Sequence, residues 1–305
     1  VKKGDKMKEI PFTGIATAIV TPMKERGVDY DALAFLIERQ IESGISAIVV
    51  NGTTGESATL TDKESESVIK FSVKTAAKRI KIIAGTGSND TRHAEKLTEY
   101  ACKTGVDGVL LVTPYYNKAT QKGLIESYAK IADASDKPCI MYNVPSRTGC
   151  NILPETVKEL SYHPKIVGIK EASGNISQVA EIISLCKEDF AVYSGNDDMI
   201  LPVLALGGKG AVSVLSNILP TETKGICDAF FSGDISAAAK TQTELIPIIK
   251  GLFSEVNPIP VKAVLAKKGF IENRLRLPLT EMDEEKREKL FNLLTERGFF
   301  TGERI

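Results

Sequence analysis

The chain has 305 residues, of which 43% are hydrophobic, so it can bury the core of two ordinary domains or of one α/β barrel with an appendage. Its 39 basic residues balance its 39 acidic residues, and this leaves no excess of positive charge for a nucleic-acid partner. No apolar run is long enough to span a bilayer, so no membrane partner is expected either.

Short apolar runs recur along the chain, with helix-like segments between them. We predict that Asp29 caps one helix, and that the capping box Thr61-Asp62-Lys63-Glu64 begins the next. Because the apolar runs lack polar alternation, they are typical of strands buried on both faces. The eight predicted strands cover residues 15–20, 47–50, 81–84, 108–112, 139–142, 166–170, 191–194 and 211–214.

Eight such strands alternating with helices favour an α/β fold, namely a (β/α)8 TIM barrel with a small C-terminal helical extension. A doubly wound sheet is the alternative, but no Gly-x-Gly-x-x-Gly sequence follows the first strand. Helices are predicted over residues 235–250, 260–267 and 283–297. We therefore expect a tail at residues 1–11, a catalytic barrel at 12–233 and the extension at 234–305.

Cysteine and histidine usage indicates the compartment and argues against a metal. The five cysteines are odd in number and widely scattered, which is typical of a reducing cytoplasm. His93 and His163 have no other ligand at metal-binding spacing, so they are interpreted as surface residues and no metal or cofactor is expected. The basic start of the chain, residues 1–6, precedes no apolar signal core and is predicted to be a solvated tail.

Lys170 closes the apolar run Ile166-Val167-Gly168-Ile169-Lys170. Burial there disfavours the charged ammonium, and a neutral amine is the nucleophile that forms a Schiff base with a ketone or aldehyde. The alternative is a lysine whose amine extends from the strand end into water.

Other chemically useful residues follow the predicted strands on the same rim of the barrel. Thr53, Tyr116 and Tyr142 supply three hydroxyls that can relay protons. The glycines beside Thr53 and Thr54 would allow backbone N–H groups to cradle a small carboxylate. Arg147 can bind a carboxylate through two parallel hydrogen bonds. Taken singly, each tyrosine could instead fill a core or an interface, and Arg147 could form a surface ion pair.

Several motifs together resemble the dihydrodipicolinate synthase family. The resemblance runs from about Phe12 to near the C-terminus, in order and at compatible spacing. Its motifs are Gly52-Thr53-Thr54-Gly55-Glu56-Ser57, Thr113-Pro114-Tyr115-Tyr116-Asn117, Tyr142-Asn143-Val144-Pro145-Ser146-Arg147-Thr148-Gly149, Gly168-Ile169-Lys170-Glu171-Ala172-Ser173-Gly174-Asn175 and Asn257-Pro258-Ile259-Pro260-Val261-Lys262.

The resemblance implies a class I aldolase-like lyase that condenses pyruvate with L-aspartate 4-semialdehyde, the first step of the diaminopimelate route to lysine. It implies a homotetramer built as a dimer of dimers. Lys170 would form the imine, and Tyr142 would act as acid and base, linked through Thr53 to Tyr116 of a neighbouring subunit. Thr54 and Val212 would contact pyruvate, Gly195 would lie beside the lysine, and Arg147 would bind the semialdehyde carboxylate.

Two alternatives stay open. N-acetylneuraminate lyase and the 2-keto-3-deoxy sugar-acid aldolases share the lysine and the tyrosine, but a polyol substrate does not need a guanidinium at Arg147. A barrel that only binds a keto acid is the other, and the presence of Lys170, Tyr142, Thr53 and Tyr116 argues against it.

The resemblance also predicts weak or absent feedback inhibition by lysine. Ser57, Ala58, Asn89 and Tyr115 match the allosteric pocket of inhibited relatives. His93 stands where those relatives have a glutamate that pairs with the ammonium of the inhibitor, and imidazole cannot supply that carboxylate. Asp62 and Ser65 stand where they have histidines, and an inward-pointing Asp62 would offset the loss.

Overall fold

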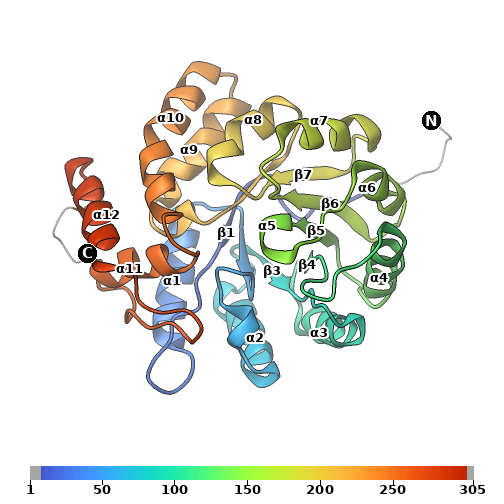
Figure 1. Ribbon diagram of the computed structural model, residues 1–305, viewed down its shortest axis with the longest axis horizontal. Coiled ribbons are helices and arrows are strands. Elements are labelled where there is room, and N and C mark those ends of the chain that lie inside the picture. The colour runs from blue at the N-terminus through green and yellow to red at the C-terminus, as the bar shows by residue number, and fades with distance from the viewer. Residues whose placement is uncertain (1–7, 301–305) are drawn as a thin grey trace. The chain divides into compact units, whose positions relative to one another are not determined.

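The computed structural model describes residues 8–300, so the predicted solvated tail at residues 1–6 lies outside the described part of the chain. Its strands form a closed barrel in the order β1-β2-β3-β4-β5-β6-β7-β8, which confirms the predicted (β/α)8 fold (Figure 1). The strands are β1 (Gly14–Ala18), β2 (Ala47–Val50), β3 (Lys81–Gly85), β4 (Gly108–Val112), β5 (Cys139–Asn143), β6 (Ile166–Glu171), β7 (Ala191–Ser194) and β8 (Gly210–Ser213).

Helices follow the strands in the sequence, and three of them lie in the predicted C-terminal extension. The helices are α1 (Tyr30–Glu42), α2 (Asp62–Ala76), α3 (Thr91–Thr104), α4 (Gln121–Asp133), α5 (Pro145–Thr148), α6 (Pro154–Ser161), α7 (Ile176–Leu185), α8 (Ile200–Ala205), α9 (Pro220–Phe231), α10 (Ile235–Leu252), α11 (Ile259–Lys267) and α12 (Glu284–Glu296). The domain boundary at residues 233 and 234 stays a prediction.

Local chemistry explains where several helices begin. The Asp29 side chain accepts a hydrogen bond from the backbone N–H of Ala32, which satisfies a free donor at the start of α1. Thr61 and Glu64 form both halves of the predicted capping box at the start of α2. Past the end of α1, Gly44 has a φ of 68°, a left-handed conformation that glycine adopts without a steric penalty.

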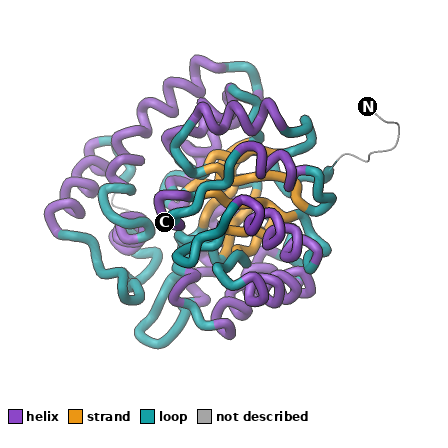
Figure 2. The backbone as a smooth tube through the Cα atoms, turned by 45° about the vertical axis from the view of Figure 1, so that its right-hand side comes forward, coloured by secondary structure: helices purple, strands orange, loops and turns teal. Residues whose placement is uncertain are grey.

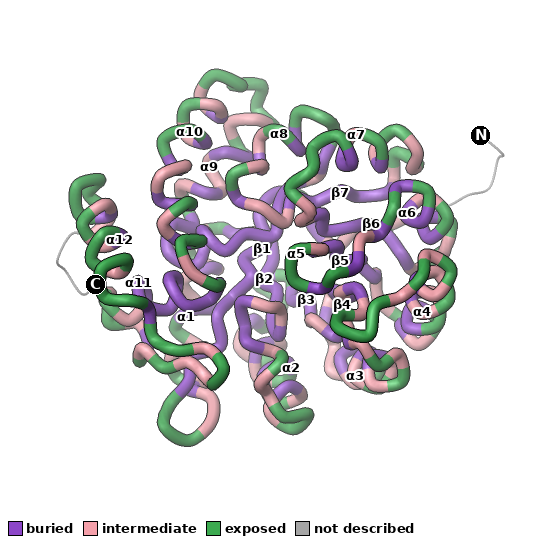
Figure 3. The backbone as a smooth tube through the Cα atoms, in the orientation of Figure 1, coloured by how far each residue is buried: buried purple, intermediate pink, exposed green. Residues whose placement is uncertain are grey.

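The chain packs as two compact units, the first of which contains residues 8–13 and 83–211 among those described. Its strands β4 to β7 are buried almost throughout, and α3, α4, α6 and α7 lie outside them (Figures 2 and 3). The rings of Phe12 and Tyr193 stack with centroids 4.3 Å apart, and the Tyr193 hydroxyl donates to the carbonyl of Phe12 at 2.7 Å. These contacts attach the start of the described chain to β7.

The second unit contains residues 14–82 and 212–300 among those described. Buried hydrogen bonds join its two segments: the Thr17 hydroxyl contacts the side chains of Gln40 at 2.7 Å and Ser216 at 2.8 Å. The amide of Asn217 donates to the carbonyl of Ala18 at 2.8 Å. Helix α10 packs against α9, α11 and α12, so the C-terminal helices are attached to the strands through α9 and β1.

All five cysteines are free thiols, and four of them are buried. Burial raises the pKa of the Cys139 thiol, in the first unit, to about 12. Burial likewise raises the pKa of Cys227, in the second unit, to about 12. Among residues 8–300, no helix is both long enough and apolar enough to cross a membrane.

Candidate active site

Tyr142 and Lys170 are the second-last residues of two neighbouring strands of the first unit. They are direct register partners of β5 and β6, so both side chains leave the sheet at the same height. Tyr142 is 7% exposed and Lys170 is 6% exposed. The amine nitrogen of Lys170 lies 4.1 Å from the centroid of the Tyr142 ring. A buried amine and a phenol are therefore held together at the C-terminal end of the sheet, where barrel enzymes carry their chemistry.

Gly195 leaves the space that Lys170 occupies. A Cβ atom built on Gly195 would lie 3.0 Å from Cε of Lys170 and 2.6 Å from the Cβ of Ala172. The backbone N–H of Gly195 also donates to the carbonyl of Glu171 at 2.7 Å. Any larger residue at this position would push against the lysine side chain.

Arg147 lies on the four-residue helix α5, directly after β5. Its backbone N–H donates to the carbonyl of Val144 at 2.9 Å, and its side chain is exposed. Gly149 ends the helix with a φ of 66°, which a residue with a side chain rarely adopts. The short helix therefore presents a guanidinium five residues after Tyr142, in the same unit.

The loop after β4 carries two adjacent tyrosines. Tyr116 is 92% exposed and has a φ of 71°, whereas Tyr115 is 37% exposed. A left-handed conformation in a bulky residue costs about 1–3 kcal/mol. The loop is held by the Asn117 side chain, which donates to the carbonyl of Asn89 at 3.0 Å. The fold thus holds an aromatic side chain in water in a strained conformation.

The predicted pyruvate contacts Thr54 and Val212 belong to the second unit, as does the hydroxyl residue Thr53. Thr54 is 2% exposed, and its hydroxyl oxygen accepts a hydrogen bond from the Asn257 side chain at 2.9 Å. Thr53 is half-buried, and Val212 lies in β8 with 1% of its surface exposed. The loop that follows β2 is therefore fixed by a residue about 200 positions further along the chain.

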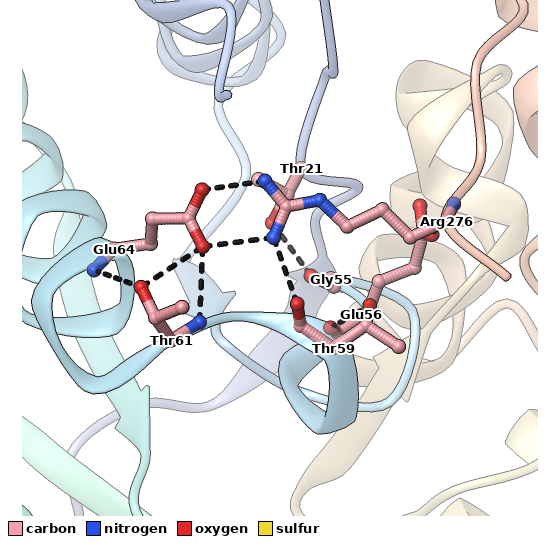
Figure 4. A network of polar contacts seen from close by, with 7 residues as sticks. All are labelled: Thr21, Gly55, Glu56, Thr59, Thr61, Glu64 and Arg276. Atoms are coloured by element: carbon pink, nitrogen blue, oxygen red, sulfur yellow. Dashed lines mark hydrogen bonds and ion pairs between the residues drawn. The ribbon is translucent and has the colours of Figure 1, made fainter. Parts of the chain in front are cut away.

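A charged network beyond this loop was not foreseen from the sequence. Lys262 is completely buried, and its amine donates to Oε1 of Glu56 and to the carbonyl of Thr21. Burial lowers the pKa of Lys262, while the neighbouring Glu56 opposes that shift. The backbone N–H of Arg276 donates to Oε2 of Glu56 at 3.1 Å (Figure 4). Lys262 closes the motif Asn257-Pro258-Ile259-Pro260-Val261-Lys262, but no sequence signal pairs it with Glu56.

Arg276 also forms a bidentate ion pair with Glu64, as Figure 4 shows. The hydrogen bonds from Arg276 lower the pKa of Glu64 to about 2. Arg276 Nη1 donates in addition to the carbonyl of Thr59 at 2.7 Å. The segment from Glu56 to Glu64 is thereby tied to the C-terminal part of the chain.

Replacing Glu64 with glutamine is expected to lower the free energy of unfolding at pH 7 by about 1–2 kcal/mol, because both partners keep about a quarter of their surface in water. A lowered pKa in the folded state stabilises the fold above pH 4.5, and this contribution is lost as the pH falls towards 2. Urea unfolding of the wild type and of Glu64→Gln at pH 7 and pH 3 measures the loss of unfolding free energy at each pH. The exposed Glu284, replaced with glutamine, is the control and should change stability by less than about 0.5 kcal/mol. An equal loss at both pH values would contradict the prediction.

The candidate allosteric residues divide between the two units. Asn89, His93 and Tyr115 lie in the first unit, where His93 is half-buried on α3. Ser57 and Ala58 lie in the second unit, on a short 3₁₀ helix after Glu56. His163 is also half-buried and its ring contacts Asp133 at 3.1 Å.

A parallel eight-stranded barrel with a buried lysine at the end of its sixth strand defines a class I aldolase-like enzyme. The sequence model described as "Dihydrodipicolinate synthetase family" matches residues 11–297. The chain belongs to this family, as predicted from its motifs.

Individual relatives agree over nearly the whole chain. It is 51% identical to the 4-hydroxy-tetrahydrodipicolinate synthase of Acetivibrio thermocellus, over 96% of this chain and 99% of that one. It is 54% identical to the enzyme of the same name from Caldicellulosiruptor saccharolyticus, over 94% and 97%. The crystal structure of dihydrodipicolinate synthase from Aquifex aeolicus has a TM-score of 0.93 at 46% identity, covering 94% of this chain and 99% of that one. The predicted fold, family and enzyme class are confirmed.

Proposed function

We propose that the chain is a 4-hydroxy-tetrahydrodipicolinate synthase that joins pyruvate to L-aspartate 4-semialdehyde through a Schiff base on Lys170. The observation that carries the proposal is the buried amine of Lys170, 4.1 Å from the ring centre of Tyr142. The enzyme name is that of curated relatives about half identical to this chain. A solved relative, 44% identical and from Acinetobacter baumannii, is described as complexed with pyruvate.

The proposed reaction begins when the Lys170 amine attacks the keto carbon of pyruvate, and loss of water gives an imine. Loss of a methyl proton then gives an enamine, whose carbon forms a bond to the aldehyde carbon of the second substrate. The amine of that substrate finally attacks the imine carbon and displaces Lys170 as the ring closes. Tyr142 is proposed to move protons in these steps, with Thr53 and Tyr116 as its relay, and its register pairing with Lys170 supports this role.

Binding of the two carboxylates is assigned to separate residues. Thr54 and Val212 are proposed to contact pyruvate, and the hydrogen bond from Asn257 fixes the Thr54 hydroxyl. Gly195 is proposed to leave room beside the lysine, which agrees with the 3.0 Å approach to its Cε. Arg147 is proposed to bind the semialdehyde carboxylate.

The competing activity is that of a sugar-acid or N-acetylneuraminate aldolase. Purified protein should be assayed with pyruvate and either L-aspartate 4-semialdehyde or N-acetylmannosamine. We expect turnover with the semialdehyde and none above background with the amino sugar. Preferred turnover of the amino sugar would overturn the proposed substrate.

Replacing Arg147 with alanine is expected to raise KM for the semialdehyde, lower kcat, or do both, and to leave KM for pyruvate nearly unchanged. Loss of a charged hydrogen bond is worth about 1.5–3 kcal/mol, which corresponds to about ten- to a hundredfold in kcat/KM. Steady-state kinetics with each substrate varied in turn measure the effect. Lysine at this position keeps the charge without the planar guanidinium, so kcat/KM of Arg147→Lys should fall between that of wild type and that of Arg147→Ala. Unchanged kinetics for the semialdehyde would remove Arg147 from this role.

Tyr116 is proposed to act in the site of a neighbouring subunit, which is supported by its 92% exposure and strained backbone. Mixed oligomers of a Tyr116→Phe chain and a Lys170→Ala chain test this. If Tyr116 acts across the interface, one intact site forms in each mixed pair, and activity should exceed that of either parent at least about tenfold. The two chains are co-expressed with different affinity tags, so that the hybrids can be purified through both tags. Hybrids as inactive as both parents would show that Tyr116 acts within its own subunit.

The homotetramer and the cytoplasmic location remain proposals, the latter supported by the odd number of scattered cysteines. Weak or absent feedback by lysine also stays a prediction, centred on His93. A solved relative from Cyanidioschyzon merolae, 39% identical, is described with lysine bound.

A further inference from the structure

Directly after Tyr142 and Lys170 come two buried polar residues, Asn143 and Glu171. They are register partners of β5 and β6, just as Tyr142 and Lys170 are. Asn143 is 0% exposed and Glu171 is 3% exposed. Because side chains alternate along a strand, this second pair leaves the sheet on the face opposite the amine and the phenol. The two pairs therefore share one stretch of backbone.

The Glu171 carboxylate accepts three hydrogen bonds within residues 8–300. Its Oε1 accepts from the backbone N–H of Ser173 at 2.6 Å. Its Oε2 accepts from the side-chain amides of Asn143 at 2.9 Å and of Gln178, on α7, at 3.0 Å. A carboxylate offers acceptors at both oxygens, whereas the amide of glutamine offers an acceptor at one end only. The surroundings thus require a glutamate rather than a residue of merely similar shape.

The same network reaches the segment that follows α5, the helix on which Arg147 lies. Oδ1 of Asn143 accepts from the backbone N–H of Ile152 at 3.0 Å, and its Nδ2 also donates to Asn151 at 2.8 Å. Asn151 and Gln178 exchange two hydrogen bonds, of 2.9 and 3.2 Å. One set of buried and half-buried side chains therefore joins the ends of β5 and β6, the helix α7 and the chain just after α5.

We propose that Glu171 is a positioning residue, which holds the strand ends so that the Lys170 amine and the Tyr142 phenol keep their mutual placement. It does so by accepting hydrogen bonds from Asn143 on the neighbouring strand β5 and from Gln178 on the helix α7. This inference rests on the proposed Schiff-base function of Lys170. Glu171 does not itself touch the substrate, since its carboxylate faces away from the amine.

The polarity of the network provides a sharp test. In Glu171→Gln, the NH₂ group must face either the amide donors of Asn143 and Gln178 or the N–H of Ser173, so at least one hydrogen bond becomes a donor–donor contact in either orientation. Asn143 cannot simply rotate its amide, because its Oδ1 is needed by the N–H of Ile152. In the double variant Asn143→Asp/Glu171→Gln, the carboxylate moves to position 143. Rotation of the Asn151 and Gln178 amides then restores every hydrogen bond of the network.

The experiment compares wild type, Glu171→Gln, the double variant and Glu155→Gln, which makes the same change at a side chain that is 71% exposed. Initial rates give kcat and KM for pyruvate, and borohydride trapping of pyruvate on Lys170 gives the rate of imine formation. We expect Glu171→Gln to lower kcat and the trapping rate by about tenfold or more, with KM for pyruvate changed less than about threefold. The double variant should recover both rates to within about threefold, and Glu155→Gln should match wild type.

Thermal unfolding of each variant separates positioning from loss of the fold. If Glu171→Gln does not fold at the assay temperature, Gln178→Leu serves instead, because it removes one of the donors to Glu171, together with the two hydrogen bonds shared with Asn151, and leaves the contact between Asn143 and Glu171 intact. It should slow trapping by about threefold. Wild-type rates in the folded Glu171→Gln, or in Gln178→Leu where that variant replaces it, would overturn the inference. A double variant no faster than Glu171→Gln would overturn it as well. Absence of a Lys170 adduct in wild type would instead overturn the proposed function.

Discussion

Replacing Lys170 with methionine is expected to lower kcat by at least about 10⁴-fold and to abolish borohydride trapping of pyruvate. Methionine fills a similar volume beside Gly195 and the Tyr142 ring, so the buried site keeps its shape. It cannot form an imine, so no enamine can be made. Initial rates together with mass spectrometry of the reduced protein measure both effects.

Lys165 provides the matched control for this experiment, because it lies just before the other end of β6. Lys165→Met should keep activity within about twofold of wild type and retain the adduct on Lys170. An adduct that maps to another lysine in the wild-type protein, or one that persists in Lys170→Met, would refute the assignment of the nucleophile.

Lys262→Met is expected to have the largest effect on stability, lowering the free energy of unfolding by about 3–5 kcal/mol. Lys262 is completely buried and Glu56 is 4% exposed, so removal of the amine leaves a buried carboxylate without its cation. The residual hydrogen bond from the backbone of Arg276 is neutral and cannot replace that charge. Chemical denaturation at neutral pH measures the loss.

The double variant Glu56→Gln/Lys262→Met separates the cost of an orphaned charge from the value of the pair. With both charges removed, most of the loss should be recovered, because exchanging a buried ion pair for neutral groups is often nearly neutral in stability. A double variant as unstable as Lys262→Met would mean that packing rather than charge governs this site. Activity should fall in both variants, since Glu56 follows directly after the loop that carries Thr53 and Thr54.

The strands were predictable because each is an apolar run buried along nearly its whole length (Figure 3). The predicted ends differ from the observed ones by at most two residues, and three strands match at both ends. For example, β8 begins at Gly210, which pairs with Tyr193, although glycine gives no strand signal of its own. The position of Lys170 followed from the same reasoning, since a charged residue closing an apolar strand is unusual on physical grounds.

Features that depend on distant or unusual contacts were not predictable. Glu56 and Lys262 are separated by 206 positions, and nothing local to either indicates the other. The left-handed backbone of Tyr116 has no signal either, because tyrosine rarely adopts it and only the surrounding loop imposes it. The acceptor role of Glu171 depends on side-chain amides from β5 and α7, which only the folded chain brings together.

The raised pKa values of two of the four buried thiols, Cys139 and Cys227, have a practical consequence. A thiol with a pKa of about 12 is a thiolate in only about one molecule in 10⁵ at neutral pH, so alkylating reagents react with it almost entirely after the surrounding structure opens. Cys139 lies in one compact unit and Cys227 in the other. Each unit thus contains its own buried thiol, and the alkylation rates of Cys139 and Cys227 report how often the structure around each of them opens.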